Sequence, residues 1–151
     1  MTYSVNFANY TIGEDAYQNV REVCRHYGKK ALLIGGEMAL KAGKEKLIQA
    51  LACEIQIVDT VLFGTDCTYA RMEELAEHAK KCGADMIFGM GGGKALDTAK
   101  GTAEKAGLPV FTFPTIAATC AATTALSVVY KEDGNFDSFY FYDKLVPHSV
   151  F

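Results

Sequence analysis

The sequence of 151 residues contains only three prolines. No apolar run in it approaches the ~18 residues that a membrane-spanning helix requires. Its first ten residues lack the basic cluster and the apolar stretch of a secretory signal. The chain also lacks a large excess of charge of one sign, because it contains 15 lysines and arginines and 18 aspartates and glutamates. Neither half of the chain is basic, so we expect no nucleic-acid partner and no membrane partner.

The cysteines lack the spacing of a disulfide framework or a zinc knuckle. Their number is odd, and no Cys-x-x-Cys pair occurs among Cys24, Cys53, Cys67, Cys82 and Cys120. We therefore interpret them as free thiols and expect a cytoplasmic protein, because thiols stay reduced in that compartment.

The three histidines also lack the pattern of a metal site or a catalytic site. His26, His78 and His148 are far apart, and we find no second ligand at metal-binding spacing from any of them. The sequence therefore predicts surface histidines, and it indicates no metal ligand and no catalytic residue in this chain.

What is present is the composition of a folded globular domain. Half of the residues are hydrophobic and 22% are charged, which excludes intrinsic disorder. We find no linker, no internal repeat and no low-complexity tract in the sequence. The length and the uniform composition predict a single domain over residues 1–151.

Helical and strand patterns alternate along the chain. Short apolar or β-branched runs predict strands at 31–34, 54–63, 85–88 and 110–113. Apolar residues at helical spacing predict helices at 14–27, 38–51, 68–81 and 94–106. Two further strands, 126–130 and 136–142, flank an Asp133-Gly134 turn. The alternation indicates an α/β fold, a mostly parallel sheet with helices on both faces, plus a C-terminal β-hairpin.

A glycine-rich segment, residues 89–93, separates a predicted strand from a predicted helix. Glycines let a ligand approach the backbone, and the free N–H groups at a helix start attract phosphate. The segment fails as a P-loop because Phe88 and Ala95 occupy the required positions, and it fails as G-x-G-x-x-G at Lys94. Two interpretations stay open: a site for a phosphate-bearing ligand, or a tight turn without a ligand.

Three loops follow strands of the predicted sheet, where α/β proteins bind ligands: 35–37, 89–94 and 114–124. Glu37 lies three residues after the first strand, and a carboxylate there can accept hydrogen bonds from a ribose diol and repel a 2′-phosphate. The alternative is a solvated glutamate at the positive end of a helix dipole.

Three segments together resemble one enzyme family. They are 91–100 (GGGKALDTAK), 114–119 (PTIAAT) and 125–130 (ALSVVY). Their order and spacing resemble the glycerol dehydrogenase branch of the iron-containing alcohol dehydrogenases, and the resemblance covers nearly the whole chain. It implies a Rossmann-like NAD-binding domain, which in the family is followed by an all-helical domain that supplies the ligands of a zinc or iron ion. This chain corresponds to the first of those two domains.

The resemblance also implies cofactor contacts for particular residues. The pyrophosphate would be held by Gly93, Lys94, Ala95, Leu96 and Asp97, with Gly91 and Gly92 in the same cofactor site. Thr115 and Thr119 would contact the nicotinamide half, and Glu37 would meet the adenine ribose. Thr124, Leu126 and Tyr130 would also line the cofactor.

Two positions depart from the family pattern. Thr124 stands where serine is common, a change that keeps a hydroxyl. Cys120 occupies the place where glycerol dehydrogenases usually carry an aspartate that contacts the polyol. A thiol is a weaker hydrogen-bonding group than a carboxylate, so Cys120 is expected at the substrate site. It would favour an alcohol less polar than glycerol, or a substrate recognised through the family's helical domain. The alternative is that Cys120 only packs beneath the nicotinamide.

The function implied by the resemblance is hydride transfer between an alcohol or polyol and NAD. This chain would be the cofactor-binding domain of a homo-oligomeric, metal-dependent enzyme. A non-catalytic nucleotide-binding module, or a truncated fragment without activity, is one alternative. The other is different chemistry on the same scaffold, as in dehydroquinate synthase or glycerol-1-phosphate dehydrogenase, but the loop 114–124 carries no basic residue for a phosphate substrate.

Overall fold

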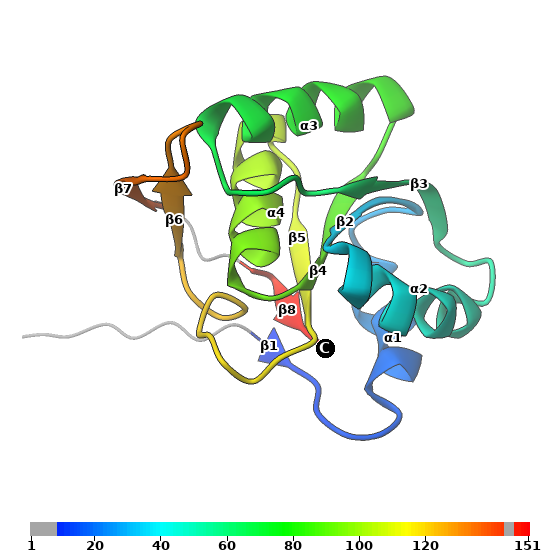
Figure 1. Ribbon diagram of the computed structural model, residues 1–151. Helices are drawn as coiled ribbons and strands as arrows, with labels where there is room; N and C mark the ends of the chain where they lie inside the picture. The colour runs from blue at the N-terminus through cyan, green and yellow to red at the C-terminus, as the bar shows by residue number, and fades with distance from the viewer. Residues whose placement is uncertain (1–8, 144–146) are drawn as a thin grey trace, which may run out of the picture.

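The computed structural model describes residues 9–143 and 147–151, and its centre is a parallel sheet (Figure 1). The strands lie in the order β1-β8-β5-β4-β2-β3, and every neighbouring pair in this sheet is parallel. Their bounds are Asn9–Tyr10 (β1), Lys30–Gly35 (β2), Gln56–Leu62 (β3), Met86–Gly91 (β4), Val110–Pro114 (β5) and Ser149–Val150 (β8). A separate antiparallel hairpin consists of β6, Leu126–Tyr130, and β7, Phe136–Phe141.

Helices connect the strands of the parallel sheet. They are the 3-10 helix η1 (Ala16–Asn19) and the α-helices α1 (Val20–Cys24), α2 (Glu37–Leu51), α3 (Tyr69–Cys82) and α4 (Gly93–Ala106). Among the residues described, every helix is too short or too polar to cross a lipid bilayer. The arrangement confirms the predicted Rossmann-like α/β fold with a C-terminal hairpin, and most predicted elements are found within two residues of their expected bounds.

Alternate side chains of the central strands pack against different helices. Leu33 of β2 belongs to a core cluster with Leu47 of α2. Leu32, the preceding residue, belongs to a second cluster with Leu75 of α3 and Ala99 of α4. Because successive residues of a strand point to opposite faces, α1 and α2 cover one face of the sheet, and α3 and α4 cover the other.

The strand before the glycine-rich segment is longer than predicted. Because β4 runs through Gly91, the predicted turn at 89–93 is wrong for its first three residues, and only Gly92 separates β4 from α4. Gly89 pairs with strands on both sides, since it lies opposite Ile34 of β2 and Thr112 of β5. Gly89 is a glycine because of close packing: a Cβ there would lie only 2.6 Å from the Cβ of Ala99. The missing side chain lets α4 lie directly on β4.

The helix predicted at 14–27 is divided into η1 and the short α1. Val20 and Cys24 are fully buried, as the helical spacing predicts. After α1 the chain turns into β2, because Asp85 Oδ2 accepts hydrogen bonds from the backbone N–H groups of Lys29 and Lys30 at 2.8 and 2.9 Å. The strand β2 therefore begins at Lys30, one residue before the apolar run that predicted it.

The prediction of surface histidines is wrong for His148, whereas His78, with a side chain that is 37% exposed, lies at the surface and has close polar partners. His148 is half-buried, with its ring centroid 5.2 Å from that of Tyr27 and 5.9 Å from that of Phe111, and burial lowers its pKa. His78 Nε2 lies 2.7 Å from Asp59 Oδ2. Tyr27, Phe111 and Asp59 are far away in sequence, so spacing did not indicate them. Cys82, whose Sγ lies 3.3 Å from His78 Nε2, follows His78 by four residues, and the sequence analysis overlooked that spacing.

An alanine at Gly89 tests the close approach of α4 to β4. We expect Gly89→Ala to lower the free energy of unfolding by about 1–3 kcal/mol, because the new methyl group overlaps Ala99. The double variant Gly89→Ala/Ala99→Gly removes that overlap, so its loss should be smaller than the sum of the two single losses. Urea denaturation of the four proteins measures this difference, and strictly additive losses would contradict the packing argument.

Candidate functional site

A groove of about 430 Å³ lies where β2 and β4 end and α2 and α4 begin. Most of its lining consists of predicted cofactor residues: Glu37, Gly91, Gly92, Gly93, Lys94, Ala95 and Thr115. The other lining residues are Gly36, Met38, Ala39 and Phe63. The structure therefore brings residues from all three predicted loops together at the carboxyl edge of the sheet.

Backbone hydrogen bonds hold the three loops in place. Gly36 N donates to the carbonyl oxygen of Met90 at 3.2 Å, and Thr115 N donates to that of Gly91 at 3.1 Å. Gly91 has a φ of 147°, and a Cβ there would lie 2.9 Å from the Cβ of Ala95. Glycine is therefore required at this position by both backbone conformation and space.

Two helices begin at the groove without a side-chain cap. Gly36 precedes α2 and Gly92 precedes α4, and neither glycine has a side chain to accept hydrogen bonds from the first helical turn. The first N–H groups of both helices, and the positive ends of both dipoles, are therefore available at the groove. This arrangement suits an anionic group such as phosphate.

Lys94 connects the groove to the hairpin. Its ammonium forms an ion pair with the carboxylate of Asp66 and lies 4.9 Å from the centre of the Tyr130 ring. The hydrogen bond to Asp66 raises the pKa of Lys94, so the lysine stays protonated. Tyr130, a predicted cofactor residue of β6, is not among the residues that line the groove, and its contact is with the Lys94 ammonium.

The loop after β5 lies against the beginning of α4. A Cβ at Gly93 would be 3.3 Å from Thr119 Oγ1, and this hydroxyl accepts a hydrogen bond from Ala121 N at 3.1 Å. Thr119 is therefore fixed beside the first residue of α4. Cys120, the next residue, is exposed and free of any disulfide.

The side chains of Leu96 and Asp97 do not reach the groove. Leu96 is fully buried, and Asp97 is 6% exposed. The Asp97 carboxylate instead forms an ion pair with Lys100, with Oδ1 and Nζ 2.9 Å apart. A contact between these two predicted residues and a cofactor would therefore involve their backbone.

The buried Lys100 fixes two other predicted cofactor residues. Its ammonium donates to the carbonyl oxygen of Thr124 at 3.2 Å and to that of Leu126. Asp97 Oδ2 accepts a hydrogen bond from Val128 N at 3.1 Å, which ties β6 to the same helix. Burial lowers the pKa of Lys100, and the Asp97 carboxylate opposes that shift. The pair thus holds the end of the loop and the start of the hairpin on α4.

Sequence reasoning missed the roles of Lys100 and Asp66. For Lys100 a local signal existed, because two charged residues of opposite sign, Asp97 and Lys100, stand three apart on an otherwise small and apolar helix face. Asp66 gave no such signal, since it precedes its partner Lys94 by 28 residues.

The chemistry of the groove is that of binding and orientation. Among its lining residues only Glu37 and Lys94 are charged, and the others offer backbone groups, the Thr115 hydroxyl and apolar surface. Two helix N-termini beside an exposed carboxylate can hold a ligand that carries both phosphate and hydroxyl groups.

Comparison with known proteins relates the chain to one family. The sequence model that describes the iron-containing alcohol dehydrogenase family matches residues 8–151 of this chain. A glycolaldehyde reductase of Halobacterium salinarum is 32% identical over 137 residues, which cover 91% of this chain and 38% of that protein. A glycerol dehydrogenase of Pseudomonas putida is 35% identical over 130 residues, which cover 86% of this chain and 36% of that protein.

A solved structure supports the same relationship. The glycerol dehydrogenase of Schizosaccharomyces pombe superposes with a TM-score of 0.82 at 26% identity, covering 99% of this chain and 38% of that one. The relatives are oxidoreductases by name, and the chain spans well under half of their length. These findings confirm the family resemblance drawn from the three sequence segments.

Removing Lys100 tests whether the buried ion pair holds the site together. We expect Lys100→Met to lower the free energy of unfolding by about 3–5 kcal/mol, because it leaves the Asp97 carboxylate buried without its cation. The double variant Lys100→Met/Asp97→Asn should recover part of that loss. The matched control is Lys105→Met on the same helix, whose ion pair with Glu73 is solvent-accessible and contributes about 0–1 kcal/mol. Equal effects of Lys100→Met and Lys105→Met would contradict this role.

Proposed function

We propose that this chain, which belongs to the iron-containing alcohol dehydrogenase family, binds NAD in the groove as the cofactor-binding part of an alcohol or polyol dehydrogenase. The observation that carries the proposal is the convergence of two uncapped helix N-termini, those of α2 and α4, on one groove. The positive ends of both helix dipoles favour the negative charge of a dinucleotide's pyrophosphate in this groove. The missing side chain at Gly91 keeps the approach to the backbone open.

The proposed orientation follows from the positions of the side chains. The pyrophosphate would lie over the first turn of α4, from Gly93 to Ala95, with Lys94 at the edge. Glu37, exposed at the first position of α2, would accept hydrogen bonds from the adenine ribose. The nicotinamide would then extend toward Thr115 and the loop that carries Thr119 and Cys120. When bound, NAD would supply a hydride acceptor for the carbon of an alcohol.

A catalytic metal does not fit the lining of this groove. Glu37 is its only side chain with a ligand atom that a zinc or iron ion prefers, and one carboxylate does not make a metal site. No step of the proposed chemistry is therefore assigned to a metal held by the groove. The zinc or iron ion implied by the family resemblance would need ligands from outside the groove.

The alternatives differ from this proposal in measurable ways. A non-catalytic nucleotide-binding module would bind NAD in the same groove but show no alcohol-dependent turnover in the complete protein. A phosphorylated substrate is disfavoured, because the loop from residue 114 to residue 124 carries no basic side chain.

The proposal also includes a small uncharged alcohol as substrate, self-association of the protein and a cytoplasmic location.

Cofactor choice tests the role of Glu37. We expect NADH to bind more tightly than NADPH, because the Glu37 carboxylate accepts hydrogen bonds from a ribose diol and repels a 2′-phosphate. Glu37→Gln should weaken NADH binding by roughly ten- to a hundredfold, the cost of about 1.5–3 kcal/mol for a lost charge-assisted hydrogen bond. Glu45→Gln, an exposed glutamate further along α2, is the matched control. Fluorescence titration measures both cofactors, and equal or tighter NADPH binding would refute the assignment.

Substrate preference tests the role of Cys120. In the complete enzyme we expect Cys120→Asp to raise kcat/KM for glycerol relative to a monohydric alcohol, by up to roughly a hundredfold, because a carboxylate accepts hydrogen bonds from a polyol and a thiol accepts them weakly. Cys53→Asp changes another exposed cysteine and serves as the control. Steady-state kinetics with both alcohols gives the ratio. If the ratio does not change, or if glycerol is already the best substrate, Cys120 does not select the substrate.

A further inference from the structure

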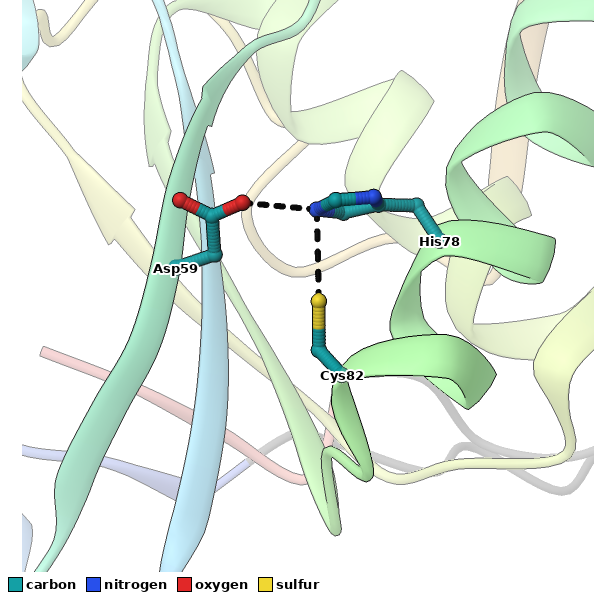
Figure 2. A group of neighbouring side chains, drawn as sticks. All are labelled: Asp59, His78 and Cys82. Carbon is teal, nitrogen blue, oxygen red and sulfur yellow. Dashed lines mark hydrogen bonds and ion pairs between the residues drawn. The ribbon is translucent and has the colours of Figure 1, made fainter.

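A second cluster of functional side chains lies away from the groove, between α3 and the outer strand β3 (Figure 2). It consists of Asp59 of β3 and of His78 and Cys82 of α3. His78 Nε2 is 2.7 Å from Asp59 Oδ2 and 3.3 Å from Cys82 Sγ. One oxygen, one nitrogen and one sulfur atom therefore lie within 4.8 Å of one another. The proposed function uses none of these three residues.

The helix supplies two of the three groups by its periodicity. His78 and Cys82 are four residues apart in α3, so they lie on one face of the helix, one turn from each other. Leu75 and Ala79 of the same helix are buried in the core cluster that contains Ile34 of the sheet. This packing holds the His78 and Cys82 face at the margin of the sheet.

An irregularity in β3 supplies the third group. The ladder between β2 and β3 shifts register after Ile57, and Val58 has no partner in β2. Ile57 packs on the α1 and α2 face of the sheet, whereas Val61 packs on the α3 and α4 face. Strict alternation would put both on one face, so the bulge turns Asp59 and Val61 toward α3. Without that extra residue, Asp59 would point away from His78.

The geometry does not suit a nucleophilic Cys-His-Asp triad. In such a triad the carboxylate and the nucleophile bond to opposite nitrogens of the imidazole ring. Here Asp59 and Cys82 both approach Nε2 of His78, which carries either one proton or one lone pair (Figure 2). One ring nitrogen cannot satisfy both neighbours equally well. Three groups with lone pairs that converge on one point are instead the arrangement that a cation requires.

We propose that Asp59, His78 and Cys82 bind a Zn²⁺ ion, with water completing its coordination. The Cys82 thiol would lose its proton to solvent and bind as thiolate, while His78 binds through the Nε2 lone pair and Asp59 through a carboxylate oxygen. Thiolate and imidazole ligands favour zinc over magnesium and calcium, which prefer oxygen. The charges of the carboxylate and the thiolate balance those of the ion.

The present distances are close to those of a zinc centre. Zinc–ligand bonds of about 2.0–2.3 Å place neighbouring ligand atoms about 3.3–3.7 Å apart in a tetrahedron. The Asp59–His78 pair, at 2.7 Å, would therefore separate by about half an ångström, and the His78–Cys82 pair, at 3.3 Å, already lies in this range. Asp59 and Cys82, whose ligand atoms lie within 4.8 Å of each other, would adjust to the same range. The side chains of His78 and Asp59 are 37% and 44% exposed, so an ion can reach them from solvent. The site would tie the outer strand to α3.

Cobalt binding tests the site, because Co²⁺ replaces Zn²⁺ and gives a visible spectrum. We expect the unmodified protein to show a thiolate-to-cobalt charge-transfer band that excess Zn²⁺ removes. Cys82→Ser should abolish the band, and His78→Gln and Asp59→Asn should weaken cobalt binding by at least the roughly 10–100-fold seen when an outer-shell partner is lost. The variants are compared as differences from the unmodified protein, so metal held elsewhere cancels.

The controls are Cys53→Ser and His26→Gln, which remove an exposed thiol and an exposed imidazole elsewhere and should leave the band unchanged. A second measurement uses the unmodified protein alone: Zn²⁺ should slow the alkylation of Cys82, but not of Cys53, in peptides analysed by mass spectrometry. A band that survives in Cys82→Ser, or alkylation of Cys82 at the same rate with and without Zn²⁺, would overturn the proposal. Neither result would contradict the proposed binding of NAD in the groove, which uses other residues.

Discussion

The candidate site depends on the buried ion pair between Asp97 and Lys100 of α4. Lys100 is fully buried, and the cost of removing its charge from water is offset only if each of its hydrogens finds a partner. The carbonyl oxygens of Thr124 and Leu126 and the Thr124 hydroxyl accept hydrogen bonds from Lys100, and the Asp97 carboxylate balances its charge, with Oδ1 2.9 Å from Nζ. None of these groups can move without exposing a buried charge, so the pair acts as a rigid joint between α4, the loop after β5 and the hairpin.

The helix α4 also forms one wall of the groove through its first turn. Its approach to β4 is fixed by the absence of a side chain at Gly89, and its first turn faces α2 across the groove. One helix therefore determines both where phosphate groups would bind and where the loop with Thr119 and Cys120 lies. A dinucleotide is long, and its two halves contact distant parts of a protein. A single rigid element that places both contact regions keeps their separation constant.

The sequence predicted most of the fold, because the elements have clear apolar periods and the helices end at strong signals. It mispredicted the end of β4, since glycines usually indicate a turn, whereas Gly89 here allows a helix to pack on a strand. The groove residues from Gly91 to Ala95 were found because they are contiguous. The pairs Lys94–Asp66 and His78–Asp59 were missed because they join distant segments, and the second also depends on a bulge at Val58 that no residue pattern marks.

The failure of both standard phosphate motifs has a physical explanation in this fold. Those motifs fix particular spacings of glycine, and in the P-loop a lysine and a hydroxyl, whereas this groove offers phosphate the backbone N–H groups of two helix starts with glycines at other spacings. Backbone groups are present whatever the side chains, so the requirement on sequence falls mainly on what is absent: a Cβ at Gly91. In the proposed function, side chains would decide which ligand is chosen, with Glu37 at the ribose and Cys120 at the alcohol. Glu37 would therefore contribute both to the strength of NAD binding and to the rejection of a 2′-phosphate, whereas a substitution of Cys120 is expected to change the choice of alcohol and leave the groove unchanged.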